Sequence, residues 1–335
     1  VKLILSTAFS LSPDTTESNT VDNKFVKQEI QAAISAAGLH STEVYVKNII
    51  DFRSLILAHK HIILLGPSRS GKSQIWKTLS RLNERQGIET RHFILPVKAL
   101  NIREIYGGVM IEKQKWVDGI LARILKSQPR SPDNSMNPCW IILDGNIDPS
   151  WCAPLQSSIS NGKHLKLLNN NKIFLTKNVK YISECTSLRH AGPITISQAG
   201  IYHVRSHDVL WVSQFYTWLK NNPDFSIQVK QNLQVIGENL FSAAHFQTTI
   251  PESPLHKNNT ICPISFSTMI DMSLLMLKHF LKLTISTEWF VLNTLFIHSI
   301  VLGMGNYIAP TKKSLFDVWI KSLGETTKKV TDDAN

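Results

Sequence analysis

Residues 66–73 have the composition and spacing of a loop that binds phosphate groups. The segment fits the pattern GxxxxGK[ST] at every fixed position and consists of Gly66, Pro67, Ser68, Arg69, Ser70, Gly71, Lys72 and Ser73. Glycines let backbone N–H groups curl around phosphate oxygens, and a following helix adds the positive end of its dipole. In such a loop Lys72 reaches the β- and γ-phosphates of a nucleotide, and the Ser73 hydroxyl ligates Mg²⁺.

The segments on either side of this loop are those that a phosphate site needs. His61–Leu65 is a short apolar run that predicts a buried strand, and residues 72–83 have helical spacing, with Ile75, Leu79 and Leu82 on one face. The alternative is a turn rich in Gly and Ser that matches the pattern by chance. The order strand, loop and helix favours the phosphate-binding interpretation.

A carboxylate suited to the metal follows a second apolar run. Residues 139–143 predict a buried strand that ends at Asp144, and we expect this side chain to hold Mg²⁺ through water. In hydrolytic proteins of this class the next residue is usually a Glu that polarises the attacking water. Here it is Gly145, which has no side chain to act as a base. The sequence therefore predicts binding of ATP and Mg²⁺ with weak or no hydrolysis, and it offers no catalytic residue.

The elements that must position these residues alternate along the chain. Further short apolar runs predict strands at 93–95, 173–175 and 179–182, and residues 115–126 and 151–159 have helical spacing. This alternation predicts a three-layer α/β sandwich with a mostly parallel sheet. From Phe225 to Leu323 the spacing becomes helical, apart from a proline-containing loop at 247–264.

These patterns divide the chain into four parts. We expect a lead-in segment at 1–52, an α/β nucleotide-binding subdomain at 53–222, a helical lid subdomain at 223–325 and a frayed polar tail at 326–335.

Composition and charge narrow the function classes. The chain has 335 residues, 43% of them hydrophobic, which excludes wholesale disorder. A net charge of +11 could attract a polyanion, so a phosphate-loop protein that acts on nucleic acid is one alternative function. The most apolar stretch, 274–304, is interrupted by Lys278, Lys282 and Glu288, so it predicts buried helices joined near residues 286–287 and no membrane span.

Several motifs in order resemble the dynein heavy chain motor, specifically the second AAA+ module of its ring. Residues 144–151 (DGNIDPSW) resemble the signature "DG-x-[IV]-D-x-x-W", and residues 193–201 (PITISQAGI) resemble "PATVSR-x-G-[MI]". The remaining similar stretches are Gly107 with 116–119 ("YG…EW-x-DG"), residues 163–167 with Ile173 ("NK-x-L-x-L…GE-x-I"), Trp211 with Trp218, and 296–319.

The resemblance implies an AAA+ fold, with a phosphate-loop α/β subdomain followed by a helical lid. It also implies ATP and Mg²⁺ as cofactors, in a ring module that holds nucleotide beside the main hydrolytic site of a microtubule motor. The partners implied are the neighbouring AAA+ modules of the same heavy chain, dynein intermediate and light chains, and microtubules through the parent motor. Nucleic acid is not among them. The implied location is cytoplasmic and cytoskeletal, including the axoneme of a cilium or flagellum.

The chain departs from the family pattern at three places. Gln198 stands where the family has the Arg of "VSR", which removes a cation if that position reaches a neighbouring γ-phosphate. The acids of "LDDNK" are missing from residues 159–163, and the "FE-x-x-DL" stretch at 183–188 keeps Glu184 but lacks the Asp. A non-motor, dynein-like pseudo-ATPase scaffold is therefore the second alternative function.

Two more carboxylates lie near the predicted site in the sequence. Asp148 follows the strand end by several residues, and we expect it to point away from the metal. Asp118 could be a structural cap or part of the nucleotide pocket, and the sequence leaves both possibilities open.

Overall fold

The computed structural model describes residues 18–110, 115–128, 137–160, 163–204, 211–262, 264–284 and 288–332, with side chains described between 26 and 324. The chain divides into two compact units. The first comprises Val1–Ala37, Ser41–Leu65 and Lys72–His203, and the second comprises Gly38–His40, Gly66–Gly71 and Val204–Asn335. The subdomain boundaries expected from the sequence stay predictions.

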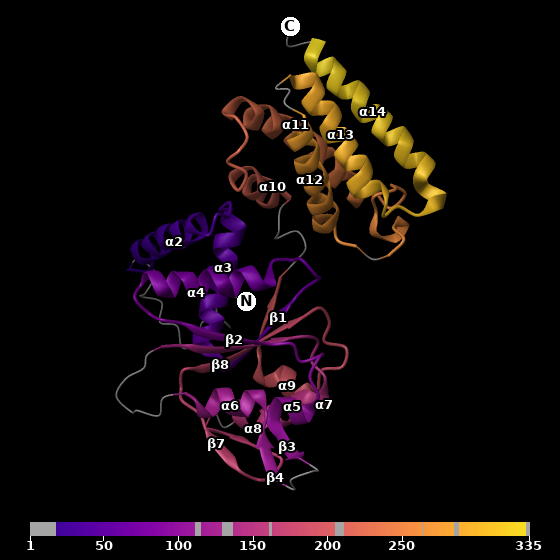
Figure 1. The fold of residues 1–335 in the computed structure, drawn as a ribbon. Coiled ribbons are helices and arrows are strands. Elements are labelled where there is room, and N and C mark those ends of the chain that lie inside the picture. Colours follow the sequence, from indigo (N-terminus) through magenta and orange to yellow (C-terminus); the bar gives the residue numbers. More distant parts are fainter. Residues whose placement is uncertain are drawn as a thin grey trace, which may run out of the picture. The chain divides into compact units, whose positions relative to one another are not determined.

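The first unit is built on a five-stranded sheet in the order β2-β5-β8-β1-β9 (Figure 1). Every neighbouring pair in this sheet is parallel. The central strands read as nearly continuous apolar runs because both faces of a parallel sheet are covered by helices. The strands are β1 (His61–Leu65), β2 (Arg91–Leu95), β5 (Cys139–Asp144), β8 (Val179–Cys185) and β9 (Gly200–His203).

Helices cover both faces of this sheet (Figure 1). One face carries α2 (Ser18–Ala36), α3 (Glu43–Ala58) and α4 (Lys72–Arg85). The other carries α5 (Ile102–Tyr106), α6 (Ile120–Lys126), α7 (Pro149–Cys152), the 3-10 helix η2 (Ala153–Leu155), α8 (Gln156–Ser160) and α9 (Pro193–Gln198). This arrangement confirms the predicted three-layer α/β sandwich.

Two antiparallel hairpins accompany the parallel sheet and correct part of the sequence prediction. They are β3 (Gly107–Met110) with β4 (Lys115–Asp118), and β6 (His164–Lys166) with β7 (Lys172–Phe174). The prediction of a helix from residue 115 was wrong over the first turn. Lys115–Asp118 is a strand that pairs with β3, and the helix begins only at Ile120. Strands β3 and β9 were not predicted, since each is four residues long and lacks an apolar run.

The second unit is helical, which confirms the predicted all-α region. Its helices are α10 (Trp211–Lys220), α11 (Ile227–Thr249), α12 (Phe266–Leu283), α13 (Trp289–Gly305) and α14 (Lys313–Asp332), with the 3-10 helices η3 (Lys257–Asn259) and η4 (Pro310–Lys312). Phenylalanines from α10, α11 and α13 meet in its core. Of the helices described, none is long and apolar enough to cross a membrane. The predicted junction near residues 286–287 lies outside the described residues.

Candidate nucleotide-binding site

Lys72 and Ser73 occupy the first positions of α4, directly after the phosphate-loop sequence. Lys72 is buried, and Ser73 is partly buried. The Ser73 hydroxyl donates a hydrogen bond of 2.6 Å to Oε2 of Glu184, at the carboxyl end of β8. Trp76, one turn further along α4, donates its Nε1–H to the other carboxylate oxygen of Glu184. The start of α4 is thus tied to the end of β8 by two side chains.

Asp144 and Glu184 lie opposite one another at the ends of adjacent parallel strands. The register of β5 and β8 pairs Asp144 with Glu184, and the Gly145 N–H donates to the Glu184 carbonyl oxygen at 3.1 Å. Burial lowers the pKa of Lys72, and the negative charges of Glu184 and Asp144 oppose that shift. Both carboxylates therefore act on Lys72, at the edge of the sheet where open α/β folds bind ligands.

Residues 66–71 belong to the second unit, and their backbone has the bends that a phosphate loop requires. Arg69 and Gly71 have positive φ angles of 60° and 84°. Gly66 packs so closely that an added Cβ would lie 2.5 Å from the Val204 carbonyl oxygen. The Ser70 hydroxyl is buried and makes no hydrogen bond within the described part of the chain. An unsatisfied buried hydroxyl in this loop suits a polar ligand.

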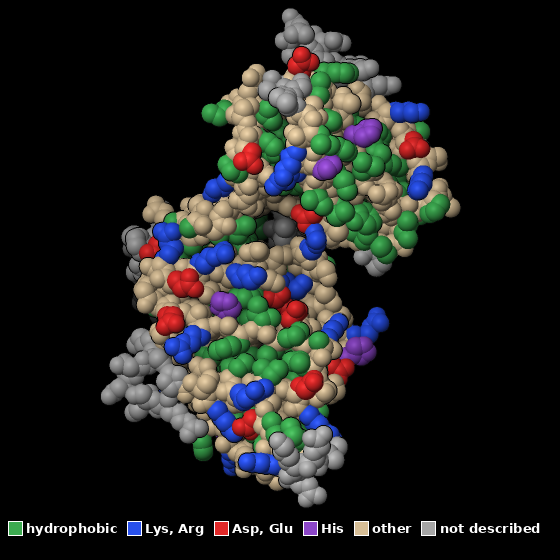
Figure 2. Space-filling model, in the orientation of Figure 1, with side chains coloured by type: hydrophobic (Ala, Val, Ile, Leu, Met, Phe, Trp, Pro, Cys, Tyr) green, Lys and Arg blue, Asp and Glu red, His purple; other side chains and the backbone are tan. Residues whose placement is uncertain are grey.

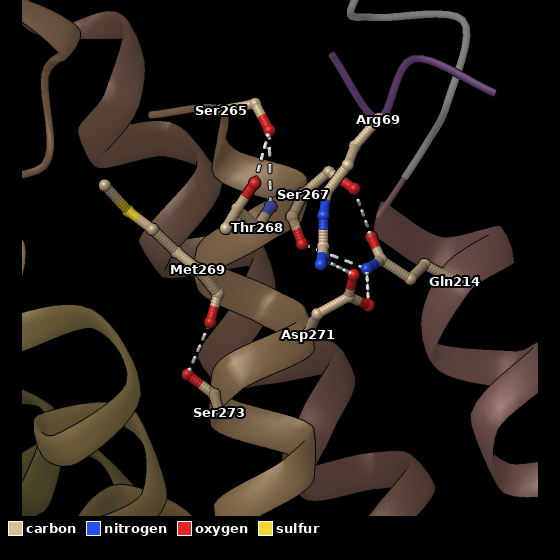
Figure 3. Close-up of polar contacts among 8 residues, drawn as sticks. All are labelled: Arg69, Gln214, Ser265, Ser267, Thr268, Met269, Asp271 and Ser273. Atoms are coloured by element: carbon tan, nitrogen blue, oxygen red, sulfur yellow. Dashed lines mark hydrogen bonds and ion pairs between the residues drawn. The ribbon is translucent and has the colours of Figure 1, made fainter. Parts of the chain in front are cut away.

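Arg69 forms an ion pair with Asp271 of α12, inside the second unit (Figure 3). Gln214 of α10 donates to the same carboxylate and to the Ser267 carbonyl oxygen, and it accepts a hydrogen bond from the Ser267 hydroxyl. Arg69 and Asp271 are about half exposed, so their pairing contributes at most about 1 kcal/mol. The main effect of the ion pair is to orient the Arg69 side chain, because Asp271 holds its guanidinium group. No local sequence pattern predicts this contact, since Gln214 and Asp271 lie on helices far from Arg69 along the chain.

Gly145 is a glycine for a reason of backbone geometry. Its φ angle is +146°, and an added Cβ would lie 2.9 Å from Cγ2 of Val97 and 3.0 Å from Cγ of Lys98. Any side chain here, a Glu included, must strain the backbone and displace these neighbours. The position that usually carries a catalytic Glu is thus shaped for glycine.

Asp148 is engaged at the start of the helix that follows it. It is the N-cap of α7, where its Oδ1 accepts a hydrogen bond of 2.8 Å from the Ser150 backbone N–H. Hydrogen bonding from Ser150 lowers the pKa of this carboxyl group. Asp148 therefore stabilises the helix start.

Asp118 makes contacts within the hairpin region, and its alternative place in the nucleotide pocket stays a prediction. It forms an ion pair with Lys126 of α6 and accepts a hydrogen bond of 2.9 Å from Nε1 of Trp116. The hydrogen bond from Lys126 lowers its pKa, and Trp116 adds to the effect. It lines a cavity of about 410 Å³ with residues of α5, β3, β4 and α6. Its role in these contacts is to attach the hairpin to α6.

The stretch after β5 is fixed by Asn146, a residue to which sequence reasoning assigned no role. Its side-chain oxygen accepts hydrogen bonds from the Thr186 N–H at 2.9 Å, the Thr186 hydroxyl at 3.0 Å and the Ser187 N–H at 3.4 Å. Trp151 donates its Nε1–H to the Asn146 carbonyl oxygen at 3.3 Å. These contacts hold together the segments that follow Asp144 and Glu184.

Gln198 ends α9 and accepts a hydrogen bond of 3.2 Å from the Ser160 hydroxyl of α8. Its amide is neutral, so this position supplies no cation.

The donor set fits a hard divalent cation. Ser73, Asp144 and Glu184 offer only oxygen atoms, the ligand type that Mg²⁺ prefers. Within the described residues no three His, Cys, Asp or Glu side chains are grouped as a metal cage. Mg²⁺ at phosphate sites usually takes one or two protein ligands and completes its shell with water and phosphate oxygens.

A parallel sheet of this order, with a phosphate-loop sequence between β1 and α4 and a helical region after it, defines the AAA+ fold of P-loop NTPases. Residues 61–191 match the family model described as "AAA domain (dynein-related subfamily)". This part of the chain therefore has the fold of an AAA domain and is similar in sequence to the dynein-related subfamily.

Curated relatives are dynein heavy chains. The chain is 24% identical over 313 residues to "Dynein heavy chain-like protein 2" of Plasmodium falciparum, covering 90% of this chain and 6% of that protein. It is 25% identical over 325 residues to "Dynein axonemal heavy chain 6" of Homo sapiens, covering 90% of this chain and 8% of that protein. It is 27% identical over 198 residues to "Cytoplasmic dynein 2 heavy chain 1" of Chlamydomonas reinhardtii, covering 59% and 4%. The chain spans less than a tenth of the length of each relative.

Proposed function

We propose that this chain is an ATP-binding module of a dynein-type heavy chain, and that it holds Mg²⁺-ATP in a regulatory or structural role. The observation that carries the proposal is the placement of Lys72 and Ser73 at the start of α4, beside two carboxylates at the ends of β5 and β8. The backbone of residues 66–73 binds the phosphates, Lys72 neutralises them, and Ser73 and Asp144 serve the metal.

Weak or absent hydrolysis is part of the proposal. Hydrolysis needs a base that orients and activates water, and the position after Asp144 is a glycine with a φ angle that disfavours any side chain. Gln198 likewise lacks the charge of an arginine finger, which is worth about 10³–10⁵ in rate where it operates. Bound ATP then acts as a lasting structural ligand of the module.

The parent protein is proposed from the relatives. Their names include cytoplasmic and axonemal dynein heavy chains and a dynein beta chain of the flagellar outer arm. We assign the chain to the second module of the ring, in contact with neighbouring AAA+ modules. The parent motor binds intermediate and light chains and microtubules, in the cytoplasm or an axoneme. Hydrophobic side chains gather on the face of the helical unit that Figure 2 shows, and they support further protein contacts. The exposed apolar residues of this unit include Leu283, Phe290 and Val318.

A nucleic-acid function has less support. On the face shown in Figure 2, Lys and Arg side chains are scattered among Asp and Glu side chains, without a continuous basic stripe. Nucleic-acid binders usually concentrate Lys and Arg on one face.

The test is calorimetry of Mg²⁺-ATP binding to the wild-type chain and to Lys72→Ala, with release of phosphate measured in parallel. We expect saturable binding by the wild type, loss of binding in the variant, and little phosphate released. Equal affinity of the two proteins would disprove the site. No binding by folded wild-type chain would contradict the proposal in favour of the pseudo-ATPase scaffold.

A further inference from the structure

We infer that Glu184, and not Asp144, is the carboxylate that positions the Ser73 hydroxyl for Mg²⁺. The inference rests on the proposed function and refines its metal site. A hydroxyl that donates its proton to a carboxylate keeps its oxygen lone pairs for a cation. Ser73 donates to Oε2 of Glu184 at 2.6 Å, a short, charge-assisted hydrogen bond. Glu184 thus holds the Ser73 O–H bond in one direction. The lone pairs of the Ser73 oxygen then point away from Glu184 and can ligate a cation.

The Glu184 carboxylate is held on both oxygens. While Oε2 accepts from Ser73, Oε1 accepts from Nε1 of Trp76, whose side chain is only 1% exposed. Ser73 and Trp76 are three residues apart and therefore lie on the same face of α4. A carboxylate fixed in this way orients a ligand without reorganising, which is the usual task of groups behind a metal's first ligands.

Asp144 has a different environment. Its side chain is exposed, and it accepts no hydrogen bond from any residue that the structure describes. Its oxygens are therefore available to water around the metal. The strand register makes this division possible, since Asp144 and Glu184 stand side by side at the sheet edge.

Glu184 is a positioning residue and not a general base. A general base needs an oxygen aimed at the attacking water, whereas the hydrogen bonds from Ser73 and Trp76 aim both oxygens of Glu184 at α4. The placement is therefore compatible with a site that binds Mg²⁺-ATP and does not hydrolyse it.

The experiment measures how strongly Mg²⁺ improves ATP binding. ATP affinity is measured by calorimetry, once with Mg²⁺ and once with EDTA. The proteins compared are the wild type, Glu184→Gln and Asp144→Asn, and each variant replaces a carboxylate by the amide of the same size. Loss of such supporting groups typically lowers metal affinity about 10–100-fold, so we expect Glu184→Gln to reduce the Mg²⁺ enhancement by about this factor. We expect a smaller reduction in Asp144→Asn. Affinity in EDTA should be unchanged or higher in Glu184→Gln, because a negative charge near the phosphates is removed.

A second variant, Trp76→Phe, and the fluorescence of Trp76 without ligand distinguish a specific effect of Glu184→Gln from misfolding of that variant. Trp76→Phe removes one donor to Glu184 while leaving Ser73 in place, and we expect an intermediate loss of the Mg²⁺ enhancement. The difference between wild-type and Trp76→Phe emission gives the spectrum of Trp76. That spectrum should shift in Glu184→Gln without any ligand, because its hydrogen-bond partner changes.

The outcomes separate the two proposals. If Glu184→Gln keeps the full Mg²⁺ enhancement, or loses less of it than Asp144→Asn does, the inference is overturned while Lys72-dependent ATP binding stands. If the wild type and Lys72→Ala bind ATP alike, or neither binds, the proposed function fails and the inference falls with it.

Discussion

At the scale of single residues, His61 shows how burial in the central sheet changes the pKa of a side chain. It is the first residue of β1, has no exposed surface, and shares a hydrogen bond of 2.8 Å between Nε2 and the Ser183 hydroxyl. Burial lowers the pKa of His61 to about 4, from the usual 6.5 of histidine. Because the folded pKa lies below the unfolded one, the unfolded chain takes up the proton first as the pH falls. The stabilising effect of a neutral His61 is complete above pH 6.5, and it is lost progressively as the pH falls from 6.5 towards 4.

We therefore expect the free energy of unfolding to fall by about 2 kcal/mol through His61 alone between about pH 7.5 and pH 5. Urea unfolding at the two pH values measures it. His61→Gln should lose this part of the pH dependence, whereas His203→Gln, at the exposed last position of β9, should retain it. Identical pH profiles for the wild type and His61→Gln would contradict the assignment.

The same scale shows what a local sequence pattern can and cannot predict. Lys72, Ser73 and Asp144 could be proposed as site residues from the sequence, because the roles predicted for them depend on a local pattern of loop, helix start and strand end. Glu184 was noticed only as a remnant of a family motif. Its contact with Ser73 joins residues 111 positions apart, and no local spacing encodes such a contact.

At the scale of elements, the helical unit depends on aromatic packing between three helices. Phe296 of α13 is fully buried, and its ring centroid lies 6.2 Å from that of Phe215 in α10 and 5.2 Å from that of Phe241 in α11. Both pairs have edge-to-face geometry, which the quadrupoles of aromatic rings favour.

Phe296→Ala should therefore lower the free energy of unfolding of this unit by about 3–5 kcal/mol, through lost burial and the cavity left behind. Phe290→Ala is the matched control, on the same helix but with 65% of the residue exposed. We expect it to stay within about 0.5 kcal/mol of the wild type. Equal effects in urea unfolding monitored by circular dichroism would refute this description of the core.

Elements with strong periodicity were predicted well, and short pairing strands were not. The apolar spacing of α4 and the continuous apolar run of β5 identify those elements directly. Lys115–Asp118 carried a helical pattern that continues into α6, but its backbone pairs with Gly107–Met110. Tertiary pairing overrides local propensity where a strand is short.

At the scale of the whole molecule, a tightly held ligand should determine stability. A ligand that binds only the folded state stabilises it by RT ln(1 + [L]/Kd), about 2.7 kcal/mol at a concentration of 100 Kd. We expect Mg²⁺-ATP to raise the melting temperature of the wild type by several degrees and to leave Lys72→Ala unchanged. Differential scanning fluorimetry over a range of ATP concentrations measures both. A concentration-independent melting temperature for the wild type would argue against ligand-dependent stability.

The sequence by itself determined the α/β sandwich and the helical region that follows, and it predicted a phosphate loop and a metal-binding carboxylate at the end of β5. These features are encoded in short patterns of residue type and in the period of apolar residues, which the chain carries locally. Only the tertiary structure decided which carboxylate meets Ser73, which partners hold Arg69, and why Gly145 excludes a side chain. Each of those depends on strand register or on contacts between distant segments, and a linear pattern does not specify such distances.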